Sequence, residues 1–272
     1  MMKAALNNLR PVWVAGLLLV LAVLCVQGLV DPAYIDLGQR LRAPDVQHWL
    51  GTDQLGRDLL GRIIQGAALT FAVALVSVCL SGVLGITVGM FAGYVGGWLD
   101  TLLMRLVDMQ LALPGLLLAL LVAAVLGPGL GNLVWVLVLT GWTGFARVIR
   151  AQVMQLRGME FILSSHAIGA GDGRILLRHI LPNIAGACLV IATLEVARVI
   201  IVEASLSFLG LGVQPPLASW GRMLVEGQVY MAQAWWVVAF PGLAILLAVL
   251  SVNLLSRALK RRFDQHQPGR GR

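Results

Sequence analysis

Six apolar blocks of about 20 residues constrain the fold of this chain more than any other feature of its sequence. They cover residues 12–30, 67–92, 102–126, 132–147, 184–206 and 236–256. A helix needs about 20 apolar residues to cross the roughly 30 Å hydrocarbon layer of a bilayer. A transmembrane barrel would instead show short segments of alternating polarity. We therefore expect an all-α, polytopic membrane protein with six transmembrane helices.

The composition supports a membrane protein. Whether the first apolar block is a signal peptide or a retained transmembrane helix is a separate question. Charged residues make up only 12% of the chain, against roughly 25% in soluble domains. Lys3 and Arg10 precede the first block, as they would in a signal peptide. Its apolar run is long for a signal peptide, and "CVQGLVDPAY" offers no small-x-small cleavage site. We expect this block to be retained as a helix.

The distribution of positive charge predicts which side of the membrane each connection occupies. Residues 147–182 hold five Arg and two acids, and the tail from Arg257 holds six basic residues and one acid. Segments 31–66 and 207–235 carry no basic excess. Because Lys and Arg are retained in the cytoplasm, both termini and the 147–182 segment are predicted to be cytoplasmic, and the other two segments extracytoplasmic. The net charge of +7 thus reflects topology and anionic lipid, and indicates no nucleic-acid partner.

Small residues recur at every fourth position along the second apolar block. The positions are Ser77, Ser81, Gly85, Gly89, Gly93 and Gly97. A spacing of four places them on one helix face, where a second backbone can approach closely. The sequence therefore predicts a helix-packing face. A smooth surface lining a pore is the alternative.

Several ionisable and proline residues fall within the blocks. Placing an ionisable group inside the membrane costs free energy, so each such group needs a partner or a water-filled path. Arg105 and Asp108 are three residues apart and predict a local ion pair at the membrane edge. We take Glu195, Arg198 and Glu203 as candidates for lining a translocation path, with a structural buried pair as the alternative. Two prolines, Pro114 and Pro241, predict bends or helix starts.

The chain lacks the motifs of an energy-converting or catalytic subunit. Its only lysines are Lys3 and Lys260, and neither follows the glycine-rich loop that a Walker motif requires. No spacing of His, Cys or acidic residues suggests a metal site. Asp53 and Asp58 in "GTDQLGRD" are better explained as turn and helix-capping residues than as a cation site. We expect no enzyme activity, no metal and no cofactor in this chain.

A basic, glycine-punctuated stretch, "SSHAIGAGDGRILLRHILPN" at residues 164–183, interrupts the apolar sequence. One short helix should end at "GDG", and a second, with Asp172 as its N-cap, should stop at Pro182. Two short helices in a cytoplasmic connection make a knob suited to a groove in a soluble partner.

Four segments carry a resemblance to a known family. They are "HWLGTDQLGRDLLGRI" (48–63), "RLVDMQLALPGLLLAL" (105–120), "AIGAGDGRILLRHILPN" (167–183) and "EASLSFLGLGVQPPLASWGRML" (203–224). Together they resemble the permease subunits of bacterial ABC importers of the dipeptide/oligopeptide/nickel class. The resemblance implies a type I ABC importer permease fold in the bacterial inner membrane. It also implies a helix and extracytoplasmic segment at 1–66, a permease core at 67–262 with a coupling loop at 148–182, and a flexible tail at 263–272.

In the family, an E-A-A-x-x-x-G signature in this loop docks on the ATPase. Aligned on Gly169, the glutamate of that signature falls on Leu163 and its alanines on Ser164 and Ser165. Glu160, one turn earlier, is the candidate replacement for the missing acid. The remaining coupling residues that the resemblance implies are Ala167, Ala170, Asp172, Arg174, Leu181 and Pro182.

The resemblance also implies partners. These are a second homologous permease subunit, two ABC ATPase subunits that bind ATP and Mg, and an extracytoplasmic substrate-binding protein. We expect di- or oligopeptides as the substrate, with nickel or a metal–opine chelate as the alternative. An integral-membrane enzyme and a passive channel are more distant alternatives: the first would need a catalytic cluster at membrane depth, and the second would have no use for a cytoplasmic knob.

Overall fold

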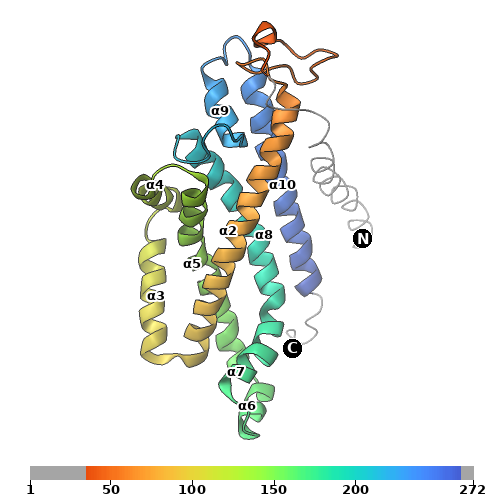
Figure 1. The fold of residues 1–272 in the computed structure, drawn as a ribbon. Helices are drawn as coiled ribbons and strands as arrows, with labels where there is room; N and C mark the ends of the chain where they lie inside the picture. The colour runs from red at the N-terminus through yellow and green to blue at the C-terminus, as the bar shows by residue number, and fades with distance from the viewer. Residues whose placement is uncertain (1–34, 265–272) are drawn as a thin grey trace.

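A computed structural model describes residues 35–264 and the side chains of residues 35–261. The first apolar block, residues 12–30, lies outside the described residues. Between residues 35 and 264 the regular structure is helical, with one isolated bridge between Thr52 and Asp58. Figure 1 shows an elongated bundle whose long helices run along a common axis.

Four helices are long and apolar enough to cross a membrane. They are α2 (Leu59–Val95), α5 (Leu130–Arg157), the continuous helix Asp172–Phe208, which contains α8 (Leu181–Phe208), and α10 (Trp236–Asp264). Each contains one predicted block, so the helices expected at 67–92, 132–147, 184–206 and 236–256 are confirmed. Pro241 lies inside α10, which continues past it.

The hydropathy of the block at 102–126 suggested one straight helix, but the structure divides this block into two helices. It forms α3 (Gly97–Leu111) and α4 (Gly115–Leu126), which are bent by 91° relative to one another. Pro114 explains the break, because proline has no N–H to continue the helix and here adopts ψ 124° just before α4. Figure 1 shows α4 lying across the bundle, while α3 runs alongside it. Counted together, the bent pair makes a fifth apolar span.

The prediction that a short helix stops at Pro182 is wrong. After α6 (Glu160–Ala167), the chain turns into α7 (Asp172–Arg174), a π-helical stretch η2 (Ile175–Ile180) and then α8 without a break. In the π-helical stretch the Leu181 N–H bonds to the Leu176 carbonyl, five residues back. Pro182 therefore lies inside a continuous helix, directly after its π-helical stretch, and does not end it.

The connections gather at opposite ends of the bundle. Helices α6 and α7 protrude at one end, whereas residues 35–58 and α9 (Trp220–Gln228) lie at the other (Figure 1). Segments 31–66 and 207–235, predicted to share one side of the membrane, thus lie together in their described parts. The predicted loop 148–182 lies at the other end, although residues 148–157 continue α5.

The small-residue face of α2 packs against α5. A Cβ added at Gly85, Gly89 or Gly93 would lie 2.3, 2.5 and 2.7 Å from a carbonyl oxygen of α5. Ser77 and Ser81 on the same helix are buried. Gly97 does not continue this face, because α2 ends at Val95 and a Cβ added at Gly97 would meet no atom within 4 Å. The two backbones therefore touch over three successive positions.

Candidate functional site

The protruding end of the bundle is built from residues 160–174, which we call the elbow. Its two arms, α6 and α7, leave the ends of α5 and α8. Three isoleucines, Ile162, Ile175 and Ile180, are fully buried where the arms meet the bundle. They belong to one apolar cluster with Ile149 and Val153 of α5. Burial of several large side chains fixes the base of the elbow to the bundle.

The tip of the elbow, by contrast, is apolar and uncovered. Ile168 is 85% exposed and Leu163 is 56% exposed. Gly169 adopts φ +79° with open space around it, which lets the chain reverse direction at the tip. An exposed apolar tip on an anchored base is the geometry of a docking knob.

The residues that the sequence assigned to coupling lie in the elbow, except Leu181 and Pro182, which begin α8. The exposed members are Glu160, Leu163, Ser164, Ala167, Gly169, Asp172, Arg174 and Pro182, and the half-buried members are Ser165, Ala170 and Leu181. The Ser165 hydroxyl donates to the Phe161 carbonyl within α6, so it faces its own helix. The Glu160 carboxylate lies in the first turn of α6, where the helix dipole favours an acid.

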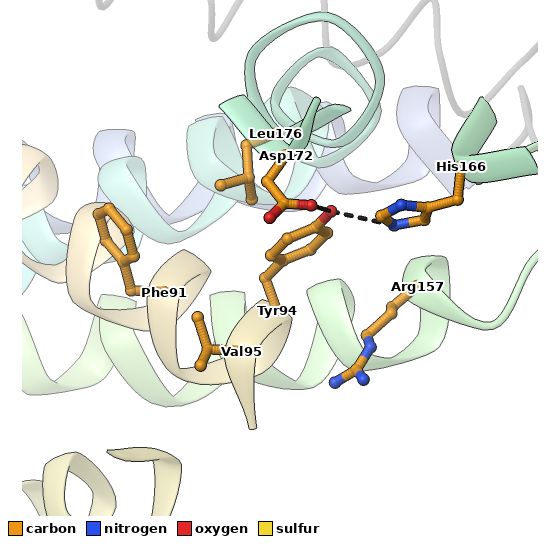
Figure 2. A pocket seen from close by; sticks show the side chains of 7 residues that line it. All are labelled: Phe91, Tyr94, Val95, Arg157, His166, Asp172 and Leu176. Carbon is orange, nitrogen blue, oxygen red and sulfur yellow. Dashed lines mark hydrogen bonds between the residues drawn. The ribbon is translucent and has the colours of Figure 1, made fainter. Parts of the chain in front are cut away.

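A cavity of about 370 Å³ opens where the elbow meets the ends of α2 and α5. Figure 2 shows Tyr94 of α2 reaching between Asp172 and His166, which belong to different arms of the elbow. The Tyr94 hydroxyl donates to Asp172 Oδ1 at 2.7 Å and lies 3.1 Å from His166 Nε2. The tyrosine and imidazole rings are also stacked, with centroids 6.2 Å apart. No sequence pattern points to Tyr94, because its partners lie 72 and 78 residues away.

Asp172 does not cap a helix, contrary to the prediction. It is the first residue of α7, the N-cap is Gly171, and no side chain caps that end. The carboxylate turns instead toward the Tyr94 hydroxyl. This contact with a side chain of α2 takes the place of a capping bond to the backbone.

The three candidates for a translocation path are divided between two environments. Glu195 and Arg198 form an ion pair on α8, with side chains 13% and 32% exposed. Their charged ends pack against glycines of α5: Cβ atoms added at Gly144 and Gly141 would lie 3.0 Å from Glu195 Oε1 and 2.7 Å from Arg198 Nη2. The pair therefore occupies the α5–α8 interface and keeps a partly open edge.

Glu203 has no such opening. It is 1% exposed, and its Oε1 accepts from the Ser207 hydroxyl at 2.8 Å. Ser207 in turn accepts from the Val213 N–H at 3.1 Å. The carboxyl thus ties the end of α8 to the segment that follows it, in a packed site separate from the Glu195–Arg198 pair.

The predicted pair between Arg105 and Asp108 is wrong. Asp108 pairs with Arg147 of α5, and Asp100 pairs with Arg150 of the same helix. Neighbours at a spacing of three along a helix gain only about 0.2–0.5 kcal/mol, so a partner on an adjacent helix readily replaces them. The cations of α5 therefore fasten α3 beside it.

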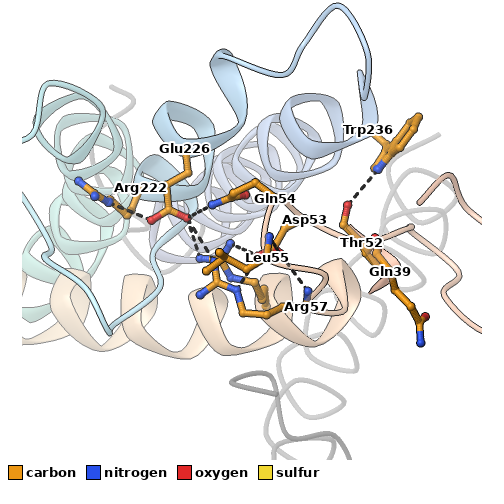
Figure 3. A network of polar contacts seen from close by, with 10 residues as sticks. Gln39, Thr52, Asp53, Gln54, Leu55, Arg57, Arg222, Glu226 and Trp236 are labelled. Carbon is orange, nitrogen blue, oxygen red and sulfur yellow. Dashed lines mark hydrogen bonds and ion pairs between the residues drawn. The ribbon is translucent and has the colours of Figure 1, made fainter. Parts of the chain in front are cut away.

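At the opposite end, residues 53–62 join α9 through a network of ion pairs. Arg62, whose side chain is 5% exposed, contacts Asp53 at 2.7 Å and Glu226 at 3.0 Å. Asp53 also accepts from Arg57, and Glu226 from Arg222. Figure 3 shows Asp53, Arg57, Arg222 and Glu226 converging between the start of α2 and α9. The partners of Arg62 lie 9 and 164 residues away, and sequence analysis identified neither of them.

The turn and capping roles predicted for the two aspartates are confirmed. Asp58 caps α2 by accepting from the Gly61 N–H, and Asp53 accepts from the Leu55 N–H. Burial opposes ionisation of the Glu226 carboxyl, but the Arg62 guanidinium and hydrogen bonds from Arg62, Gln54 and Arg222 lower its pKa below the usual 4.5. The Glu226 carboxyl is therefore ionised at neutral pH.

The sequence of this chain is similar to those of several known transport-system proteins. Residues 85–266 match the model of the family described as binding-protein-dependent transport system inner membrane component. The dipeptide transport system permease protein DppC of Alkalihalophilus pseudofirmus is 40% identical over 83% of this chain and 74% of its own length. The di/tripeptide permease DppC of Pseudomonas aeruginosa is 42% identical over 87% and 76%. The glutathione permease GsiD of Pectobacterium atrosepticum is 41% identical over 85% and 77%.

A solved structure shares the fold. It is an inward-facing conformation of the MetNI methionine ABC transporter, with a TM-score of 0.62 and 18% identity. The match covers 75% of this chain and 97% of the MetNI chain. At this identity the likeness concerns the fold alone.

Proposed function

Since this chain belongs to the family of binding-protein-dependent transport system inner membrane components, we propose that it forms half of the pore of an ATP-driven importer, beside a second homologous permease. The first apolar block supplies a sixth span, and both termini face the cytoplasm. The elbow then lies in the cytoplasm, and residues 35–58 with α9 face outward. The basic excess of residues 147–182 supports this orientation.

Partner chains supply the energy in this proposal. Two ATPase subunits bind ATP and Mg, and their closure displaces the elbow, which biases the bundle toward its outward-open state. The observation that carries the proposal is the elbow itself, whose base is buried on three isoleucines while Ile168 at its tip is 85% exposed. A solitary channel or a membrane enzyme would have no use for such an apolar tip.

Small peptides are the proposed cargo, delivered to the outer end by a substrate-binding protein. The names of the three relatives above support this choice, because they specify dipeptide, di/tripeptide and glutathione transport. Nickel or a metal–opine chelate has no comparable support. A binding screen on the substrate-binding protein, with dipeptides, glutathione and Ni²⁺ as probes, tests the assignment. Capture of Ni²⁺ without capture of any peptide would contradict it.

The coupling role is tested by placing a charge at the tip of the elbow. Ile168→Glu should abolish ATP-dependent uptake of a labelled dipeptide into proteoliposomes that contain the whole complex, because a carboxylate cannot enter an apolar groove unpaired. Ile168→Glu should also weaken binding of the ATPase subunits, and Val46→Glu is the matched control for that binding, because Val46 is 92% exposed but belongs to the opposite end. Both variants should fold normally, since neither side chain is buried. Unchanged uptake by Ile168→Glu would refute the coupling role.

A further inference from the structure

The geometry points to Tyr94 as a positioning residue that transmits movement of the elbow to α2. The inference rests on the proposed function above. It starts from the contact of one hydroxyl with both arms of the elbow: His166 belongs to α6 and Asp172 opens α7. A displacement of either arm therefore changes the surroundings of one atom on α2.

The proton count fixes how the three groups are joined. An ionised carboxylate only accepts hydrogen bonds, so the single hydroxyl proton of Tyr94 goes to Asp172. The Tyr94 oxygen then has only lone pairs to offer His166. His166 Nε2 must carry the proton that it donates to this oxygen at 3.1 Å. The chain runs from His166 through Tyr94 to Asp172, and each link is directional.

Directional links do something that the apolar base of the elbow cannot do. Ile162 and Ile175 are buried against the bundle, but apolar contact is non-directional and tolerates sliding. A hydrogen bond weakens steeply when its angle or length changes. The Tyr94 links therefore set the register of the elbow on α2, and the isoleucines only keep it attached.

The helix that receives this movement is locked to a second one. Tyr94 lies one residue beyond Gly93, where an added Cβ would be 2.7 Å from the Arg150 carbonyl of α5. Backbones in contact cannot shift independently, because interiors respond to strain as packed bodies. A pull on Tyr94 therefore moves α2 and α5 as a pair, from the elbow toward the outer end.

The test removes the hydroxyl and keeps the ring. Tyr94→Phe preserves the stacking on His166 but breaks both links. In the reconstituted complex, we expect the number of dipeptides imported per ATP hydrolysed to fall about thirtyfold, the factor that corresponds to the loss of two hydrogen bonds of typical net strength. ATP hydrolysis and binding of the ATPase subunits should persist. Tyr230→Phe is the matched control, since it removes a hydroxyl bonded to Arg40 at the outer end.

A second pair of variants separates positioning from bulk structure. Asp172→Asn keeps an acceptor oxygen for Tyr94 and should retain most of the coupling. Asp172→Ala breaks one of the two links and should lower the coupling ratio about fivefold, less than Tyr94→Phe does. Equal coupling ratios in wild type and Tyr94→Phe would overturn the inference, and so would equal losses in Asp172→Asn and Asp172→Ala.

Hydrogen exchange decides the matter if Tyr94→Phe fails to assemble. In the full chain in detergent, exchange of the amides of residues 162–170, which one link through His166 holds to Tyr94, should rise about fivefold in Tyr94→Phe and stay unchanged in Tyr230→Phe. No rise would overturn the inference. If the wild-type complex imports nothing in response to ATP, the proposed function fails, and exchange still reports whether Tyr94 holds the elbow.

Discussion

Replacing single glycines on α2 by alanine should reveal how closely this helix is packed on α5. At Gly85 the added methyl would lie 2.3 Å from the Trp142 carbonyl oxygen and 2.6 Å from Phe145 Cβ. Restoring an ordinary contact of 3.4 Å requires the helices to separate by about 1 Å, a gap that forfeits much of the dispersion energy between them. At Gly82, three residues earlier, the nearest atom is Phe145 Cζ at 3.5 Å, so the methyl fits.

The comparison isolates the steric effect. Both variants gain helix propensity, about 1 kcal/mol for Ala over Gly, and this gain cancels between them. Overpacking typically costs about 1–3 kcal/mol, so Gly85→Ala should be less stable than Gly82→Ala by that amount. Denaturation in mixed detergent micelles, followed by tryptophan fluorescence, measures the free energies of unfolding. Equal stability of the two variants would refute the close contact.

Further predictions concern the network at the outer end. Arg62→Leu leaves the buried Asp53 and the partly buried Glu226 short of a cation and should lower the free energy of unfolding by about 3 kcal/mol. Arg42→Leu, which removes only an exposed pair, should change it little, and similar losses in both would argue against burial as the cause. The lowered pKa of Glu226 contributes stability that is complete above pH 4.5 and is lost as the pH falls through that lowered pKa. Glu226→Gln should lack this acid dependence in thermal unfolding, and identical pH profiles would contradict the assignment.

The sequence was sufficient where local pattern and physical need coincide. Hydropathy located the helices, because a span must be continuously apolar whatever it packs against. The spacing of four predicted the face that holds Gly85, Gly89 and Gly93. Hydropathy alone did not predict the 91° bend at Pro114, because an average hydropathy over a window carries no information about the direction of the helix axis. The proline itself did predict a break.

Ion pairs and hydrogen bonds between different helices of the bundle could not be predicted from the sequence. Arg105 and Asp108 are neighbours along one helix, yet Asp108 took Arg147 from another helix as its partner. Tyr94 in the candidate site has no local signature, because its role comes from two groups that folding brings to it from beyond α5. Long-range polar partners depend on how the helices pack. That packing leaves no periodic pattern in a single sequence from which the partners could be predicted.

The claim that the elbow receives movement from an ATPase is tested most directly by cross-linking. Ile168→Cys, in a chain whose Cys25, Cys79 and Cys188 are replaced by serine, should link to the ATPase subunit through a short bis-maleimide in the assembled complex. The yield should change when ATP is added. Val46→Cys, at the opposite end, should give no such product. Absence of a product from residue 168, or equal yields from residues 168 and 46, would contradict the account.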